Sequence, residues 1–158
     1  MTRIIFYTIC MIGLLFSSCK KDPIAQSNSD YIIFGHFYGE CSGERCIEIF
    51  KLEKDKIFED KNDFYPNFKS FYTGDFFQIS QDYYEYAKDL NSSFPKDLLN
   101  DSTTVFGYPD ASDGGGLYVE YNFDGIRKFW IFDQFQKNVP EKYHFFMDEV
   151  NRKIGRIK

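Results

Sequence analysis

The chain has 158 residues, of which 43% are hydrophobic and 27% are charged, and its formal net charge is −5. This composition predicts a folded domain and excludes a disordered, highly charged chain. It also argues against nucleic acid as a partner, because phosphate binding depends on clustered Lys and Arg and the sequence contains no such block.

The first eighteen residues have the layout of a secretory signal. Arg3 is the only charge before Lys20, and residues 4–16 are almost entirely apolar. Two serines then precede Cys19, where the polarity changes abruptly. The apolar stretch is too short to span a bilayer, which needs about 20 residues. We therefore expect a signal that is removed, and a buried helix of the domain is the alternative.

The sequence Leu15-Phe16-Ser17-Ser18-Cys19 resembles a lipobox, the site at which bacterial lipoproteins are cut before a cysteine that carries diacylglyceride. Together with the Lys-Lys-Asp that follows, it resembles lipoproteins of Bacteroidota. The resemblance covers residues 1–22 and implies a lipid on Cys19, attachment to a membrane and a place in the cell envelope, at the outer membrane. The remaining domain resembles uncharacterised lipoproteins of that phylum, which implies no particular activity.

Three segments follow from this interpretation. We expect a signal peptide at 1–18, the lipidated cysteine with a polar, flexible tether at 19–30, and a single α+β domain at 31–158. The mature chain would hold 18 Lys and Arg against 24 Asp and Glu, a net charge of −6. Such a charge suits a domain that does not adhere to anionic membrane surfaces.

Hydrophobic periodicity predicts strands and helices beyond residue 30. Runs rich in Ile, Phe, Tyr and Val predict strands at 31–39, 45–54, 56–60, 75–80, 103–107, 117–123 and 126–133. Helical spacing of apolar residues predicts helices at 81–90, within 92–100 and at 140–155. The dipeptide Asp124-Gly125 favours a hairpin turn. The expected fold is α+β, an antiparallel sheet of two hairpins in the order hairpin, helix, hairpin, helix, with the helices on one face.

Cys41 and Cys46 are the cysteines that remain after cleavage and lipidation. An even remainder in an exported chain predicts a disulfide, which would clip the loop between the first two strands and contribute only about 2 kcal/mol. A redox dithiol, free thiols and a zinc site are the alternatives. Zinc would need further ligands, and His36 and His144 lie far apart in the sequence.

The loop at 108–116 is the most specific candidate for a site. It contains Asp110 and Asp113, and three consecutive glycines follow. The carboxylates and backbone carbonyls of this loop could collect the oxygen ligands that Ca²⁺ prefers. The glycines could instead line a binding cleft by close backbone approach, or form a flexible lead into the next strand. The flexible lead is the favoured interpretation, and we expect no metal and no cofactor.

The outer face of the second hairpin is the candidate for partner binding. We assign Tyr118, Glu120, Asn122, Lys128 and Trp130 to this face. Exposed Tyr and Trp side chains are frequent anchors of interfaces, which singles out Tyr118 and Trp130. The alternative is that Trp130 lies beneath the last helix.

The sequence carries no Ser-His-Asp order, nucleophile elbow, Walker A motif or His-Glu-x-x-His pattern. We therefore expect a lipid-anchored envelope protein that binds a protein or glycan partner without catalysing a reaction. One alternative is a hydrolase of envelope polymers with a site near Asp110, Asp113 or His36. Another is an inhibitor or immunity-type protein.

Overall fold

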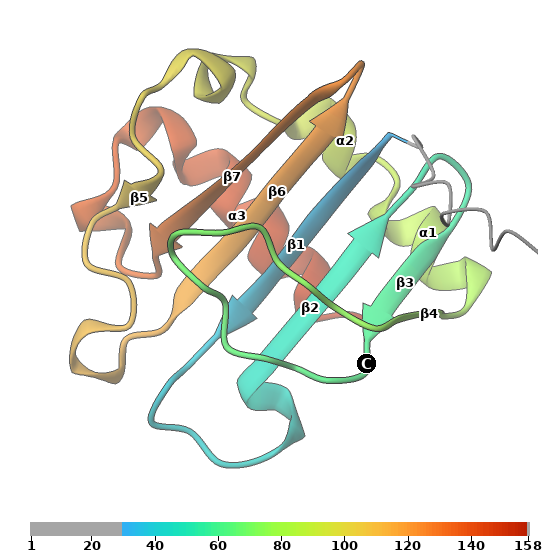
Figure 1. Ribbon diagram of the computed structural model, residues 1–158, viewed down its shortest axis with the longest axis horizontal. Helices are drawn as coiled ribbons and strands as arrows, with labels where there is room; N and C mark the ends of the chain where they lie inside the picture. The colour runs from blue at the N-terminus through green and yellow to red at the C-terminus, as the bar shows by residue number, and fades with distance from the viewer. Residues whose placement is uncertain (1–29, 158) are drawn as a thin grey trace, which may run out of the picture.

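The computed structural model describes residues 30–157 (Figure 1). The expected signal peptide, the lipidated Cys19 and most of the expected tether lie outside the described residues. The elements, in chain order, are β1 (Tyr31–Phe37), β2 (Ile47–Leu52), β3 (Ile57–Asp60), β4 (Phe76–Gln78), α1 (Gln81–Ala87), α2 (Leu90–Ser93), β5 (Val105–Phe106), β6 (Gly116–Phe123), β7 (Ile126–Asp133) and α3 (His144–Ile154). Short 3₁₀ turns lie between several of them.

The strands form one sheet in the order β4-β3-β2-β1-β6-β7-β5. All neighbours are antiparallel except β5 and β7, which are parallel. Because β1 pairs with both β2 and β6, it joins the two halves of the chain into a single sheet. The α+β class is confirmed, but the expected order of hairpin, helix, hairpin, helix is not, because β1 to β4 form a four-strand meander and the short β5 precedes the second hairpin. Along the chain, a four-strand meander comes first, then α1 and α2, then β5 with the β6–β7 hairpin, and finally α3.

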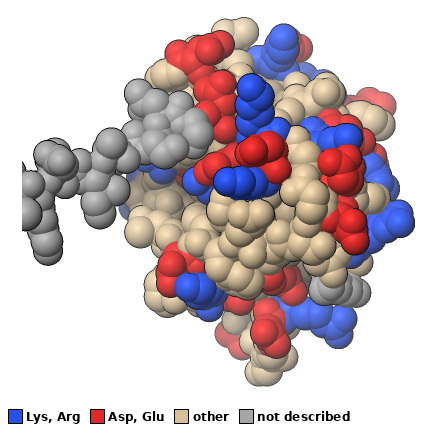
Figure 2. All heavy atoms as spheres, turned by 90° about the vertical axis from the view of Figure 1, so that its right-hand side faces the viewer, with Lys and Arg blue, Asp and Glu red and all other residues tan. Residues whose placement is uncertain are grey.

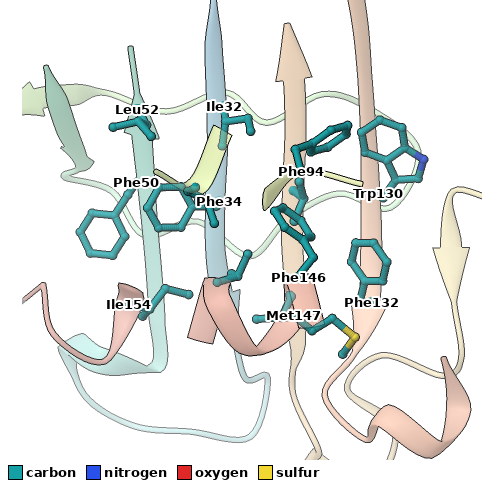
Figure 3. Packing of buried hydrophobic residues seen from close by; sticks show 14 of the residues in the cluster. Ile32, Phe34, Phe50, Leu52, Phe94, Trp130, Phe132, Phe146, Met147 and Ile154 are labelled. Carbon is teal, nitrogen blue, oxygen red and sulfur yellow. The ribbon is translucent and has the colours of Figure 1, made fainter. Parts of the chain in front are cut away.

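The helices cover one face of the sheet (Figure 1). One face of α3 is apolar, as an amphipathic helix requires, and the residues of this face are almost fully buried: Phe146, Met147, Val150 and Ile154. Figure 3 shows Phe146, Met147 and Ile154 packed against the large side chains of the strands. Phe94, at the end of α2, lies 5.6 Å from the ring of Phe146 and 5.7 Å from that of Trp130.

The loop at 61–75, between β3 and β4, crosses the other face of the sheet (Figure 1). A second, smaller core forms beneath it from buried residues of the strands and the loop: Ile33, Phe37, Ile49, Tyr72, Tyr118 and Ile131. Strand β1 is therefore buried on both faces, and its consecutive residues Ile32, Ile33 and Phe34 are all nearly inaccessible. This explains why its sequence is a continuous apolar run instead of an alternating one.

The prediction that Tyr118 and Trp130 share an exposed face is wrong. In the β6–β7 register, Val119 lies opposite Trp130 and Tyr118 lies opposite Ile131, so the two aromatic rings point to opposite faces. Trp130 is 1% exposed beneath the helices and Tyr118 is fully buried beneath the 61–75 loop. The alternative, with Trp130 in the core, is the one that the structure shows.

Candidate binding site beside β7

Glu120 is the most buried acidic side chain of the described residues, with an exposed fraction of 0% in the middle of β6. The hydroxyl of Tyr31 donates to its Oε1 at 2.9 Å, and the hydroxyl of Tyr118 donates to its Oε2 at 2.7 Å. Arg127 completes the set, since its Nε and its Nη2 each lie 2.8 Å from Oε1. A carboxylate survives in such a place only when it is paired and hydrogen-bonded in this way.

The two tyrosines act as fixed donors to this carboxylate. Burial, followed by the charge of Glu120 itself, raises the pKa of Tyr31 and of Tyr118 above the ordinary tyrosine value. Both hydroxyls therefore keep their protons at any physiological pH. The Glu120 charge is stabilised by these donors and Arg127, and the cluster is a rigid support within the sheet.

The same cluster fixes the 61–75 loop across the sheet. The backbone N–H of Tyr72 donates to the hydroxyl of Tyr118 at 2.9 Å. The hydroxyl of Tyr72 donates to the buried carboxylate of Asp60 at 2.6 Å, and that carboxylate also accepts the N–H of Asp75 at 2.6 Å. The loop is therefore held both at its ends and over the middle of the sheet, although it has no regular secondary structure.

Arg127 is fixed between the buried cluster and the surface. Phe71, from the 61–75 loop, packs on its guanidinium with 4.0 Å between the ring centroid and Cζ, and the Phe71 ring also contacts that of Phe129 at 5.4 Å. The Arg127 side chain remains 40% exposed. Stacking on an aromatic ring and a bond to a carboxylate hold a guanidinium in one orientation, so its position is set before any partner arrives.

A groove of about 300 Å³ opens beside this guanidinium, along the outer side of β7. Three parts of the chain line it: the 61–75 loop, the segment that leads into β5, and β7 itself. The lining residues are Phe71, Asp101, Ser102, Thr104, Arg127, Lys128, Phe129 and Trp130. Aromatic surface with a few placed hydroxyls and charges is the usual make-up of a binding site.

Two other hollows are weaker candidates. One of about 220 Å³ lies on the far side of Arg127, where Lys51 is already paired with Glu53 at 2.5 Å. Another of about 390 Å³ is bordered by Asp30, the first described residue, so its outline depends on chain that the structure does not describe. The groove beside β7 is bounded by described residues and combines aromatic surface with the fixed guanidinium of Arg127, and this makes it the candidate site.

The loop with Asp110 and Asp113 is built around one carboxylate. Oδ2 of Asp110 accepts the N–H of Gly39 and the hydroxyl of Tyr65, each at 2.9 Å, and Oδ1 accepts the N–H of Gly115 at 3.2 Å. Asp110 therefore ties three loops together at the end of the sheet. Asp113 lies at the exposed turn of this loop with a positive φ of 59°. The structure does not bring these two residues to the groove beside β7.

The predicted disulfide between Cys41 and Cys46 is confirmed. It clips the connection between β1 and β2, as expected. The two histidines serve elsewhere: Nε2 of His36 lies 3.1 Å from the carbonyl of Arg45, and Nε2 of His144 lies 2.8 Å from that of Val139. In residues 30–157, no three His, Cys, Asp or Glu side chains are grouped so as to hold a metal ion.

Acidic residues gather where β2, β3 and the 61–75 loop meet. Burial, followed by the charges of Glu59 and Asp63, raises the pKa of Glu48 to about 7. Burial, followed by the charge of Asp60, raises the pKa of Asp63 to about 6. On the surface that includes the β4 edge, by contrast, acidic and basic side chains are interspersed around an uncharged centre (Figure 2).

No protein-family model matches this chain, and no curated protein matches its sequence. Within the part of the chain that the structure describes, no helix is long and apolar enough to cross a bilayer. A fold of this general class hosts many unrelated functions, so the function has to be argued from the site.

Sequence reasoning missed most of the groove. Phe71 comes from an irregular segment with no periodicity, and nothing local connects it with β7. The sequence did contain a signal for the Glu120–Arg127 ion pair. If Asp124-Gly125 forms the two-residue turn of the hairpin, Glu120 and Arg127 are diagonal neighbours on the two strands. An acid and a base at such positions predict a cross-strand pair.

Proposed function

We propose that this chain is a lipid-anchored protein of a bacterial cell envelope that binds a partner without catalysing a reaction, and that the groove beside β7 is its binding site. The lipobox-like sequence at 15–19 supports the anchor and the envelope. The binding-site proposal depends mainly on one observation: the guanidinium of Arg127 is fixed beside the rings of Phe71 and Phe129, which form the aromatic floor of a groove of about 300 Å³.

The groove favours binding over chemistry. Both oxygens of Glu120 are occupied by donors from Tyr31, Tyr118 and Arg127. This carboxylate is thus committed to holding the guanidinium in place. Aromatic side chains beside an Arg are typical of the residues that dominate binding energy at interfaces.

A photo-crosslinking amino acid in place of Ser102, in the full-length chain on intact cells, tests this proposal. Ser102 is exposed at the rim of the groove. We expect a discrete adduct with one envelope component, and we expect it to weaken when Phe71→Ala is added, because the aromatic floor is then lost. The same crosslinker at Lys56, in the exposed turn between β2 and β3, is the matched control. Equal adducts from both positions, or none from Ser102, would contradict a binding role for the groove.

A further inference from the structure

The outer edge of β7 is paired along only part of its length. Strand β7 has eight residues, and β5 lies opposite only Ile131 and Phe132. The N–H of Ile131 donates to the carbonyl of Thr104 at 2.8 Å, which shows that the backbone groups of Ile131 face outward. Because these groups alternate in direction along a strand, the N–H and C=O of Phe129 and Arg127 also face the outer edge.

The groove lies where this edge is unpaired. Before Thr104, the segment that leads into β5 diverges from β7, and among residues 30–157 no backbone hydrogen bond joins it to Phe129 or Arg127. The groove therefore presents two N–H donors and two C=O acceptors in strand geometry. An exposed edge of this kind is a template for one further extended chain.

Charge selects the kind of chain that fits. Lys128 projects on the helix side of the edge, where its Nζ donates to the carbonyl of Leu99 at 2.6 Å. No Asp or Glu of the described residues lies within ion-pair distance of it. Arg127, by contrast, is already neutralised by Glu120. An acidic residue on the incoming strand would find its partner in Lys128.

The same charge argues against a second copy of this chain. Antiparallel pairing of two β7 edges centred on Lys128 would place the two ammonium groups opposite each other, and like charges in directly opposed positions destabilise a sheet. Lysine on an edge strand is a common device against such self-association.

We propose that the β7 edge from Arg127 to Phe129 binds an extended, acidic segment of a partner protein, which adds to the sheet as a further strand. The partner's backbone pairs with Phe129 and Arg127, its apolar side chain lies on Phe71 and Phe129, and its carboxylate pairs with Lys128. This is strand addition, in which main-chain hydrogen bonds supply affinity and side-chain contacts supply specificity. The inference rests on the proposed function, since it names the partner class of the same groove.

The direct test is amide hydrogen exchange by NMR on the mature lipidated chain in detergent micelles. The probe is a capped seven-residue peptide in which Val alternates with Glu around a central Phe. At saturating peptide, we expect exchange of the Arg127 and Phe129 amides to slow by about tenfold or more. The Lys128 amide already faces β6 and should not change, so it is the internal control.

A charge exchange provides the second test. Lys128→Glu should weaken binding of the Glu peptide by roughly three- to tenfold and strengthen binding of a matched peptide with Lys in place of Glu. Lys56→Glu changes the net charge equally at an exposed turn away from the groove, and it should leave both affinities as they are. Titration followed by NMR measures the four combinations.

Two results would overturn strand addition. If a partner is captured at Ser102 but the peptide leaves the Arg127 and Phe129 amides unprotected, the groove binds in some other way and only the proposed function stands. If these amides are protected without peptide, and their protection rises with the fraction of dimer measured by analytical ultracentrifugation, the edge pairs with a second copy of the chain.

Discussion

Glu120 and Arg127 form an ion pair of unequal members. The carboxylate is completely buried, whereas the guanidinium is 40% exposed. Removing the exposed member would leave a buried charge whose donors are the hydroxyls of Tyr31 and Tyr118 and, at 3.4 Å, the backbone N–H of Tyr72. This asymmetry makes Arg127 far more important for stability than its exposure indicates.

We expect Arg127→Ala to lower the free energy of unfolding by about 3 kcal/mol, because an unpaired buried charge is costly. Urea denaturation at neutral pH measures the change. Arg152→Ala is the matched control, since Arg152 pairs with Glu149 at the surface of α3 and exposed pairs contribute little. A similar small loss in both variants would show that Glu120 does not depend on Arg127.

Glu48 makes stability depend on pH. Its pKa is raised from an ordinary 4.5 to about 7, first by burial and then by neighbouring carboxylates. The folded state thus holds this proton more tightly than the unfolded state does. The contribution to stability is complete below about pH 4.5 and is lost as the pH rises through about 7.

Glu48→Gln cannot ionise and should escape this loss. Between pH 4.5 and pH 8, we expect the variant to gain about 1 kcal/mol in unfolding free energy relative to the unsubstituted chain, less than the raised pKa alone implies because solvent screens a partly exposed carboxylate. Urea denaturation across this range measures it. Glu141→Gln, at an exposed position, should show no such trend, and a flat difference for Glu48→Gln would refute the assignment.

At the scale of elements, the 61–75 loop is the least regular segment and one of the best anchored. Its anchor at the β3 end is Asp60, which is 2% exposed and accepts the hydroxyl of Tyr72 and the N–H groups of Asp63 and Asp75. Three donors need the acceptor capacity of both carboxylate oxygens. An amide at position 60 would turn its N–H₂ group toward at least one of these three donors.

Asp60→Asn should therefore release the loop. We expect a loss of about 2 kcal/mol in unfolding free energy and faster trypsin cleavage after Lys69, which is exposed within the loop. Limited proteolysis followed by mass spectrometry detects the cut. Asp55→Asn, in the exposed turn between β2 and β3, should be cleaved at the rate of the unsubstituted chain. Equal rates for both variants would mean that Asp60 does not hold the loop.

The hairpin shows where element-level reasoning succeeded and where it failed. The Asp124-Gly125 turn, both flanking strands and their alternation are confirmed. The error lay in the register: a two-residue turn pairs Phe123 with Ile126, so each odd-numbered position faces an even-numbered one. Applied strictly to the sequence, this rule places Tyr118 and Trp130 on opposite faces of the hairpin.

At the scale of the whole molecule, the domain begins beside the β6–β7 turn. Oδ1 of Asp30 accepts the N–H of Asp124 at 3.1 Å. The open part of β7 starts directly after this turn, so the groove lies near the end of the domain where the chain enters. If the chain is anchored by a lipid as proposed, this end of the domain faces the membrane, and a partner would reach the groove from the side.

The anchor itself is tested by intact mass. We expect membrane-extracted protein to begin at Cys19 and to carry the added mass of its acyl chains. More than one acyl chain is expected, because a single acyl chain binds a membrane only weakly. Cys19→Ser should lose that mass. Cys10→Ser lies in the segment expected to be removed, so it should give an unchanged mature mass. Retained Met1 or an unmodified Cys19 would contradict the lipoprotein interpretation.

Local pattern was sufficient for much of this protein. The strands, the first and last helices, the hairpin turn and the disulfide between Cys41 and Cys46 follow from periodicity, turn residues and cysteine count. The helix expected within 92–100 does not, since α2 is Leu90–Ser93 and Lys96–Asn100 is a 3₁₀ turn. Each confirmed feature depends on residues that are close in the sequence, which is why the sequence alone determined them. The lipid on Cys19 is a prediction of the same local kind.

Tertiary structure decided the rest. The 61–75 loop has no local pattern, and only its contacts with Tyr118 and Asp60 bring Phe71 over Arg127. The short β5 covers two residues of β7 and leaves the rest of that edge open. Glu120 looked like a surface residue because strand alternation reports two faces but not what covers them. Burial and the groove depend on contacts between distant segments, which no local pattern encodes.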